Sequence, residues 1–487
     1  MAERAVVLGG HKKLRLPDAV AQSVGFMGPV FSSAFLIPLL VGVNASGNGA
    51  GAAAPLSVVI STIGVLGLGW IISEYARRIH AAGSLYDYVT DGLGARIGAG
   101  AGFAYYGGIL ALGAAILVLI GGTIHDTLQA EFNVAPIPTI GWDLILLVGI
   151  GALLYAGVSL STRTQLVLAL VSLVVVTVFF ISVIVKVGSH NSLSAFSPSA
   201  SPTGMKGILF GVLYGVLLFT GFETAANLGE ETEHPKRDIP RAVLFALLLA
   251  AGFYILASYA QVAGFHFSLK EISKAAAGPL FVLGSPAAQG GYGSDWIRRL
   301  LELVVVLDML AVYIGVSVSA SRGIFAMARD ARLPAQLTNI SATRKTPVGA
   351  STLVVVVYAA VIAITEWWTG LFALPQTPHY AAMFSWLATF GPFALALVYL
   401  LMTIGAVRGL SDHPRRWAVW LASIVGAVTV ISALFGSIYK VPMPTVSASW
   451  AALGWFIVGM VVMSILPGKR KAGSPAAEAA GEVTIGS

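Results

Sequence analysis

The sequence predicts an all-α membrane protein with twelve transmembrane helices. Of its 487 residues, 57% are hydrophobic and only 10% are charged, and the mean hydropathy is +0.84. Soluble proteins carry about a quarter charged residues, so most of this chain belongs in lipid. The chain has no cysteine, which excludes disulfides and thiolate metal sites.

Twelve apolar runs are each long enough to cross the hydrocarbon core, which takes about 20 helical residues. We predict spans near residues 19–43, 55–79, 98–128, 141–162, 164–187, 205–230, 240–264, 298–328, 349–369, 381–406, 416–438 and 447–466. They form one transmembrane domain, residues 17–466. It lies between a polar segment, residues 1–16, and a tail rich in Ala, Gly and Ser, residues 467–487, which we expect to be disordered.

The basic residues orient these spans. If the N-terminus is cytoplasmic, 22 of the 29 lysine and arginine residues fall on the inner side and seven on the outer side. This asymmetry favours a multi-pass protein of the plasma or inner membrane with both termini in the cytoplasm. The net charge of +7 then reflects topology and contact with anionic lipid, not nucleic-acid binding.

Two loops are long enough to hold structure of their own. Residues 80–96 have the amphipathic pattern of an interfacial helix on the inner side, and residues 265–297 are predicted to form a short helical hairpin on the outer side. We also expect ion pairs on the inner side of the membrane that stabilise one state of a gate. The residues expected to form them are Glu74, Arg77, Arg78, Arg322, Arg329 and Asp330.

Two of the spans contain helix-breaking residues. In the first, Gly25, Gly28 and Pro29 fall together, and Pro29 lacks an N–H and clashes with the preceding turn. In the sixth, Gly221 and Glu223 interrupt an apolar run. Each taken alone also fits an ordinary kinked or closely packed helix, with Glu223 in a salt bridge.

The spacing of the two interruptions points to a transport site. They lie five spans apart, and an odd offset reverses orientation in the membrane. Two inverted five-helix repeats, each beginning with a broken helix, are the pattern of secondary transporters, whose substrate site lies near the midplane.

Three segments resemble the amino acid–polyamine–organocation superfamily. They are GFETAANLGEETEHPKRDIPRAV (221–243), AAGSLYDYVTDGLGARIGAGAGF (81–103) and SASRGIFAMARDARLP (319–334) followed by KTPVGA (345–350). The resemblance implies a leucine-transporter-type fold of two inverted five-helix repeats plus two peripheral helices. It also implies alternating-access transport of an amino acid or a related amine. The chain departs from the family at Gly28-Pro29-Val30, where one glycine and one amide donor of the usual Gly-x-Gly element are missing.

The resemblance and the breaks together predict the substrate-binding residues. Helix 1 would offer amides and carbonyls to the substrate, and helix 6 would form the opposite wall. In the family an aromatic residue of helix 6 closes over the substrate; Phe219 is the first choice and Tyr214 the second, and either could instead be ordinary packing. The predicted binding residues are Ser23, Gly25, Phe26, Met27, Gly28, Phe219, Thr220, Gly221 and Phe222.

Two carboxylates are predicted to gate or to carry protons. Glu223 matches the family's helix-6 acid. Asp308 lies ten residues after Arg298, roughly 15 Å along a helix and so near the midplane. Intramembrane carboxylates are costly and functional by default. Asp308 could pair with a cationic substrate group, bind protons or serve structurally.

The coupling ion stays open between H⁺ and Na⁺. Some proton-coupled relatives carry a lysine midway along helix 5; this chain has no charge between Arg163 and Lys186, and Ser172 lies roughly where the lysine would be. A sodium site could then use Ser317 or Ser319, since oxygen ligands suit a hard cation. We favour proton coupling through Asp308 or Glu223, with uncoupled exchange as an alternative.

Other classes of protein fit less well. A channel would show a carbonyl filter or an acidic ring, and an enzyme would show a metal cluster, nucleophile elbow or phosphate loop; none of these patterns is visible in the sequence. We expect no cofactor. The partners expected are the small-molecule substrate, the coupling ion and the lipid bilayer.

Overall fold

The structure, a computed structural model, describes residues 13–42, 49–134, 136–275, 278–367, 370, 373, 377–439, 441 and 443–466, without the side chains of 158–163 and 213. Most of the predicted N-terminal segment and the predicted disordered tail, 467–487, lie outside these residues.

The described residues are almost entirely helical. The α-helices are α1 (Leu16–Met27), α2 (Pro29–Val41), α3 (Ala54–Ala76), α4 (Leu85–Leu93), α5 (Ala95–Phe132), α6 (Thr139–Ala156), α7 (Val158–Val187), α8 (Met205–Leu218), α9 (Pro235–Gly264), α10 (Leu269–Lys274), α11 (Pro279–Gly284), α12 (Asp295–Arg329), α13 (Val348–Trp367), α14 (His379–Gly409), α15 (Arg416–Gly436) and α16 (Thr445–Ile465). Short 3₁₀ helices include η1 (Gly51–Ala53), η2 (Gly188–His190), η3 (Leu193–Phe196), η4 (Pro198–Ala200), η5 (Phe222–Leu228), η6 (Ala287–Gln289) and η7 (Ala335–Thr338).

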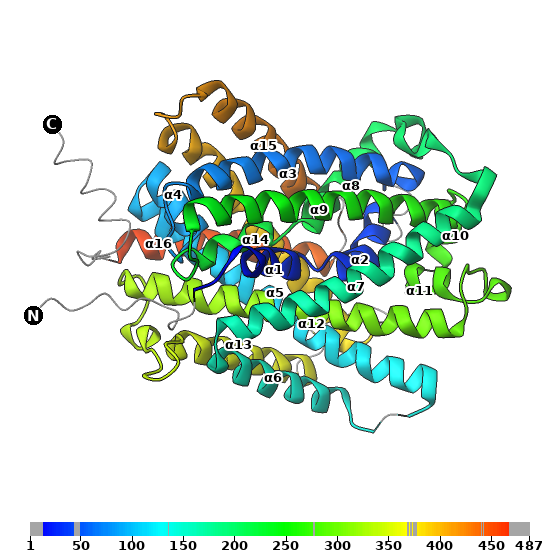
Figure 1. The fold of residues 1–487 in the computed structure, drawn as a ribbon, viewed down its shortest axis with the longest axis horizontal. Coiled ribbons are helices and arrows are strands. Elements are labelled where there is room, and N and C mark those ends of the chain that lie inside the picture. Colours follow the sequence, from blue (N-terminus) through cyan, green and yellow to red (C-terminus); the bar gives the residue numbers. More distant parts are fainter. Residues whose placement is uncertain are drawn as a thin grey trace, which may run out of the picture.

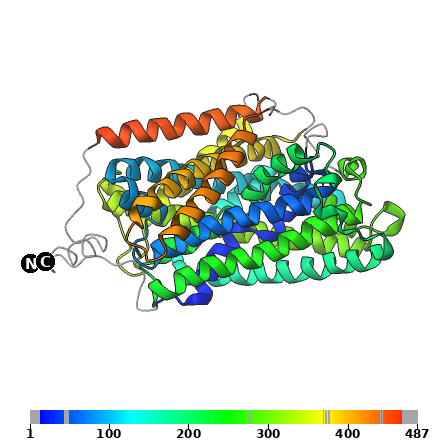
Figure 2. The same cartoon turned by 90° about the horizontal axis from the view of Figure 1, so that it is seen from above.

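Twelve helical segments are long and apolar enough to span a membrane, which confirms the predicted number. Most of them run side by side along the long axis of the bundle, with α6 and α13 on one flank and α15 on the other (Figure 1). Viewed at right angles, α16 lies along an edge of the bundle (Figure 2).

Burial separates central helices from peripheral ones. In the first span, formed by α1 and α2, 83% of the apolar window is buried, and in α12 78%, but in α16 only 28%. Large apolar side chains such as Val185, Val428 and Ile465 point away from the bundle and are more than half exposed. Such a surface suits lipid, because soluble proteins rarely expose large contiguous apolar patches.

The predicted boundary between the fourth and fifth spans, residues 162–164, is wrong. Helix α6 ends at Ala156, and α7 begins at Val158. Gly157 separates them with φ +117°, a conformation that residues with a Cβ rarely adopt. The apolar run continues across this break, so hydropathy alone gave no signal for it.

The two structured loops are present. Helix α4 lies within residues 80–96, and its side chains are mostly buried against the bundle. In the loop 265–297, α10 and α11 are the two short helices of the expected hairpin.

Candidate functional site

The first span is broken at Gly28. Helix α1 ends at Met27 and α2 starts at Pro29, and Gly28 between them has φ 53° and ψ 68°. A Cβ at this position would lie 2.1 Å from Cγ2 of Val312 on α12, so glycine is needed for space as well as for conformation. The hydroxyl of Ser32 donates a hydrogen bond to the carbonyl of Met27 at 2.9 Å.

The sixth span is broken between Leu218 and Phe222. Gly221 has φ 105°, and the chain continues as the 3₁₀ helix η5. A Cβ on Gly221 would lie 1.9 Å from Cδ1 of Phe26, so the ring of α1 packs directly on the backbone of this break.

Ser23 joins the two broken helices by hydrogen bonds. Its hydroxyl donates to the carbonyl of Phe222 at 2.6 Å and accepts from the amide of Ala225 at 3.1 Å. A buried backbone group without a partner is costly in lipid. The two breaks therefore face one another and share their polar groups.

Asp308 from α12 reaches the start of α2. Its Oδ2 accepts a hydrogen bond from the amide of Phe31 at 2.8 Å. Its Oδ1 is buried and has no hydrogen-bond partner. The carboxylate thus caps the positive end of the half-helix that follows the break.

The predicted aromatic residues occupy two different places. Phe219 is fully buried and packs edge-on against Tyr254 of α9, with ring centroids 5.2 Å apart. Tyr214 and Thr220 line a pocket between α8, α14 and α15 that also contains Tyr399. Phe222 lies near this pocket, its ring 6.0 Å from that of Tyr399.

Gly25 faces α7 and does not face the break in the sixth span. A Cβ on Gly25 would lie 2.2 Å from Cγ of Gln165 on α7. The amide group of Gln165 donates to the carbonyl of Ala311 at 3.2 Å, so this side chain fills the space between α1 and α12. Ser172 lies farther along α7 and donates to the carbonyl of Val304 on α12 at 2.8 Å.

Glu223 is buried at the start of η5. Its Oε1 accepts a hydrogen bond from the hydroxyl of Tyr105 on α5 at 2.7 Å, and its Oε2 has no hydrogen-bond partner. The salt bridges found among the described residues do not include Glu223, so the salt-bridge alternative raised by the sequence finds no support there.

Ser317 and Ser319 do not converge on one point. The hydroxyl of Ser317 donates to the carbonyl of Tyr313 at 2.7 Å and lies 3.0 Å from the hydroxyl of Tyr358 on α13. Ser319 instead accepts from the side-chain amide of Asn227 on η5. Within the part of the chain that the structure describes, no group of three or more His, Cys, Asp or Glu residues could hold a metal ion.

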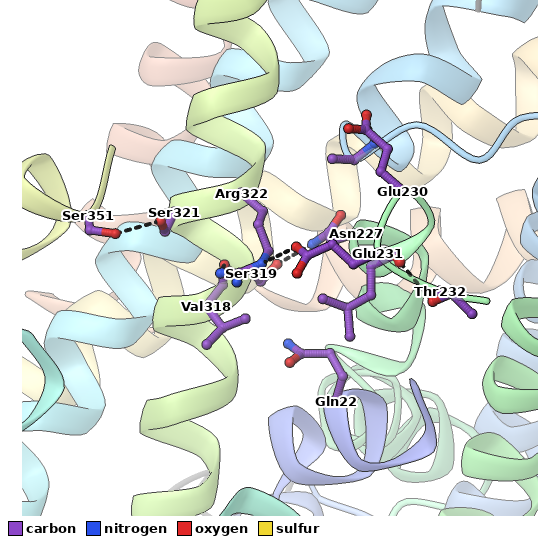
Figure 3. Close-up of polar contacts among 12 residues, drawn as sticks. Gln22, Asn227, Glu230, Glu231, Thr232, Val318, Ser319, Ser321, Arg322 and Ser351 are labelled. Carbon is purple, nitrogen blue, oxygen red and sulfur yellow. Dashed lines mark hydrogen bonds and ion pairs between the residues drawn. The ribbon is translucent and has the colours of Figure 1, made fainter. Parts of the chain in front are cut away.

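A polar cluster closes the end of the bundle where Lys13 and Leu466 lie, which we call the termini side. Arg322 of α12 pairs with Glu231 at 2.8 Å, and both side chains are at most 5% exposed. Asn227 donates to Ser319 just beside this pair (Figure 3). Arg329 forms two further bonds with Glu230, at 2.7 and 2.8 Å. We call these six residues the termini-side network.

The N-terminal segment adds an isolated β-bridge to this closure, between Leu14 and Thr232. The amide of Leu14 donates to the carbonyl of Glu231 at 2.9 Å, and the carbonyl of Leu14 accepts from Glu233 at 2.8 Å. Lys13 donates to the carbonyl of Glu230 at 3.1 Å. Backbone pairing thus holds the start of α1 against the segment after η5.

Of the residues expected to form ion pairs, Glu74 and Arg77 pair with each other at 3.4 Å. The three other arginines pair with carboxylates that the sequence analysis did not name. Glu230 and Glu231 take up Arg329 and Arg322, and Arg78 pairs with Asp412 at 2.5 Å. Asp330 accepts from Tyr86 at 2.9 Å. The signal was available, since Glu230-Glu231 stands inside the segment that carried the family resemblance.

Glu230 should make the closure sensitive to acid. Burial acts to raise the pKa of Glu230, but hydrogen bonds from Arg329 and Ala82 outweigh it and hold the pKa below its ordinary value. A lowered folded-state pKa adds stability above the unfolded-state pKa, and this stability is lost as pH falls through the folded value. We expect wild type to melt at a higher temperature than Glu230→Gln at pH 7, with the gap closing below about pH 4. Melting of the detergent-purified proteins from pH 3 to 7 measures this, and a gap that is constant with pH would contradict it.

The facing breaks inside a twelve-helix membrane bundle define this chain as a multi-pass membrane transporter. The chain belongs to the amino acid permease family, whose model matches residues 24–463. The branched-chain amino acid permease BcaP of Bacillus subtilis is 24% identical over 331 residues; the alignment covers 62% of this chain and 66%, just under two thirds, of BcaP. An uncharacterised transporter of Mycobacterium tuberculosis is 26% identical over 94% of this chain and 92% of that protein.

Solved structures show the fold. A manganese transporter of Eremococcus coleocola superposes with a TM-score of 0.55 at 15% identity, over 92% of both chains. The fold is therefore the leucine-transporter type, with inverted five-helix repeats and two peripheral helices. The assignment of spans one to five and six to ten to the two repeats stays a prediction.

Proposed function

We propose that the chain is a secondary active transporter that moves an amino acid or a related amine across the cell membrane by alternating access. The observation that carries this proposal is the contact of Phe26 with Gly221, which sets the two broken helices against each other. Irregular backbone at membrane depth is tolerated where it serves a cavity or site. The name of BcaP, a branched-chain amino acid permease, supports the substrate class.

In this proposal the substrate binds between the two breaks. Phe26, Met27 and Gly28 form one wall, and Phe219 and Gly221 form the other. The hydrogen bond of Ser23 to the carbonyl of Phe222 fixes the position of one break relative to the other. Gly25 leaves room for the side chain of Gln165. Thr220 and Tyr214 line the adjoining pocket. The termini-side network is the gate on one side, and the basic residues around it support a cytoplasmic position for both termini.

We propose that coupling is to protons and that Glu223 carries them. The carboxylate is buried and has one oxygen without a partner. Its other oxygen accepts a hydrogen bond from the hydroxyl of Tyr105. This hydroxyl carries no charge, so it does not hold the carboxyl group of Glu223 in its ionised form. The hydroxyls of Ser317 and Ser319 are engaged with different helices, which favours a proton over sodium.

Replacing Glu223 by glutamine should separate coupling from exchange. Glutamine keeps an oxygen to accept from Tyr105 but cannot lose or gain a proton. We expect uptake driven by an inward proton gradient in proteoliposomes to fall at least about ten-fold, while counterflow of labelled substrate against unlabelled substrate continues. A variant that still accumulates substrate from a pH gradient would remove Glu223 from coupling.

The same vesicles test the proposed function as a whole. A carrier gives saturable, counterflow-capable uptake of an amino acid or amine; flux that rises linearly with concentration would indicate a channel instead. Uptake that needs a sodium gradient, or exchange indifferent to any gradient, would support the alternatives to proton coupling.

A further inference from the structure

The amides of the first break are already committed within the chain. The amide of Gly28 donates to the carbonyl of Val24 at 3.2 Å, and that of Ser32 donates back to Gly28 at 2.8 Å. Pro29 has no N–H at all. The start of α2 therefore has only two further amides to offer.

Asp308 lies at this end of α2. The amide of Phe31 donates to its Oδ2 at 2.8 Å. A helix N-terminus binds one anion well, because its free N–H groups and dipole point at it. Here the anion is a side chain of the protein itself, so a carboxylate brought by a substrate would have to compete with Asp308 for this helix end.

Asp308 has no counter-charge beside it on α1, α2 or α12, within the residues that the structure describes. Among the described residues of α1 and α2 there is no lysine, arginine or histidine. The nearest basic residues on α12 are Arg299 and Arg322, nine and fourteen positions away, or about 14 and 21 Å along the helix. Oδ1 is buried without a partner, which is costly for an ionised group.

The helix with the second carbonyl end, α8, packs against α2. The hydroxyl of Tyr254 on α9 donates to the carbonyl of Leu218 at 2.7 Å. Leu218 is the last residue of α8, and the C-terminal end of a helix favours a cation. The region between α2 and α8 is thus negative, with walls formed by Phe219 and other apolar side chains.

We infer that the site takes an amine without an α-carboxylate, because Asp308 supplies the carboxylate that an α-amino acid would bring. The ammonium group of the substrate pairs with Oδ1 of Asp308, and its apolar body packs on the aromatic wall of the sixth span. This inference rests on the proposed function and narrows its substrate class. An α-amino acid would set its own carboxylate beside that of Asp308, where like charges repel.

Matched pairs of amino acids and their decarboxylated amines test the inference. Purified full-length protein in proteoliposomes is assayed for saturable counterflow of labelled phenylalanine against phenethylamine, leucine against isoamylamine, and lysine against cadaverine. In at least one pair we expect the amine to be transported about ten-fold better than its amino acid, the scale of one charge-assisted bond. If the amino acid is preferred in every transported pair, the inference is wrong and the proposed function stands; if no pair gives saturable counterflow, both fail.

Three variants separate the charge of Asp308 from its structural role. Asp308→Asn keeps an oxygen for the amide of Phe31 but loses the charge, so amine counterflow should fall at least about ten-fold. Asp143→Asn is the matched control, because Asp143 on α6 is also a buried carboxylate without partners. Pro29→Ala restores a backbone amide at the break, which can donate to a substrate carboxylate. In this variant the amino acid of each pair should compete more strongly with its amine for transport. Amine transport by Asp308→Asn at the control's rate would overturn the inference, as would unchanged competition in Pro29→Ala.

Discussion

Replacing Gly221 by alanine is expected to impair transport strongly while leaving the protein in the membrane. Alanine at φ 105° is strained by about 1–2 kcal/mol, and its Cβ would lie 1.9 Å from Cδ1 of Phe26. The ring cannot stay where it is, so the two breaks must separate or shift. Because the proposed site lies between them, we expect substrate counterflow to fall at least about ten-fold.

Two further variants identify the cause. Gly454→Ala on α16 is the matched control, since a Cβ there meets nothing within 4 Å, and it should transport as wild type. In Phe26→Ala/Gly221→Ala the clash is gone and only the backbone strain remains, so part of the counterflow should return if packing is the larger effect. Wild-type counterflow by Gly221→Ala alone would show that the contact of the breaks is not needed.

Replacing Arg322 by methionine should open the termini side. Methionine is close to arginine in length but leaves Glu231 buried and without its ion-pair partner. Removing one member of a buried ion pair costs about 3–5 kcal/mol, and about 3 kcal/mol changes an equilibrium more than a hundred-fold. We expect the closed arrangement to lose that much stability relative to an open one, because only the closed one buries the pair.

The cysteine-free chain makes the opening measurable. A single cysteine at Ala226, a buried position of η5, should react with a maleimide at least about ten-fold faster when Arg322 is methionine. Arg78→Met is the control, because its pair with Asp412 is largely exposed and such pairs are worth at most about 1 kcal/mol. Equal labelling rates in the Arg322 and Arg78 variants would show that the buried pair does not hold this side closed.

The sequence predicted the breaks because their causes are local. Pro29 removes a helix hydrogen bond wherever it stands in a helix interior, and glycine at 28 and 221 permits the positive φ values observed. The number of spans followed equally from local hydropathy. The role of the predicted site residues in binding stays a prediction, which the variants above address.

The partners of the site residues could not be read from the sequence. Phe31 and Asp308 are 277 positions apart, and Arg322 and Glu231 are 91 apart. Such contacts depend on how the helices pack, and no periodicity records them. Gln165 was missed for the same reason: its position on α7 matters only because Gly25 and Gly315 leave space for it.

The 3₁₀ form of η5 also depends on a distant residue. In an α-helix the amide of Ala225 would donate within its own segment, and the carbonyl of Phe222 would accept from four residues ahead. The hydroxyl of Ser23 bonds to both groups. This contact with α1 is not recorded in the sequence of η5 itself.

The β-bridge at Leu14 ties α1 to the segment after η5. Leu14 is two residues before α1, and its amide and carbonyl are bonded to Glu231 and Glu233. Helix α1 cannot tilt away from η5 until both backbone bonds break. An opening on this side that moves α1 away from the segment after η5 would have to break this bridge first, together with the bond from Lys13 to the carbonyl of Glu230 and the ion pair of Arg15 with Glu233.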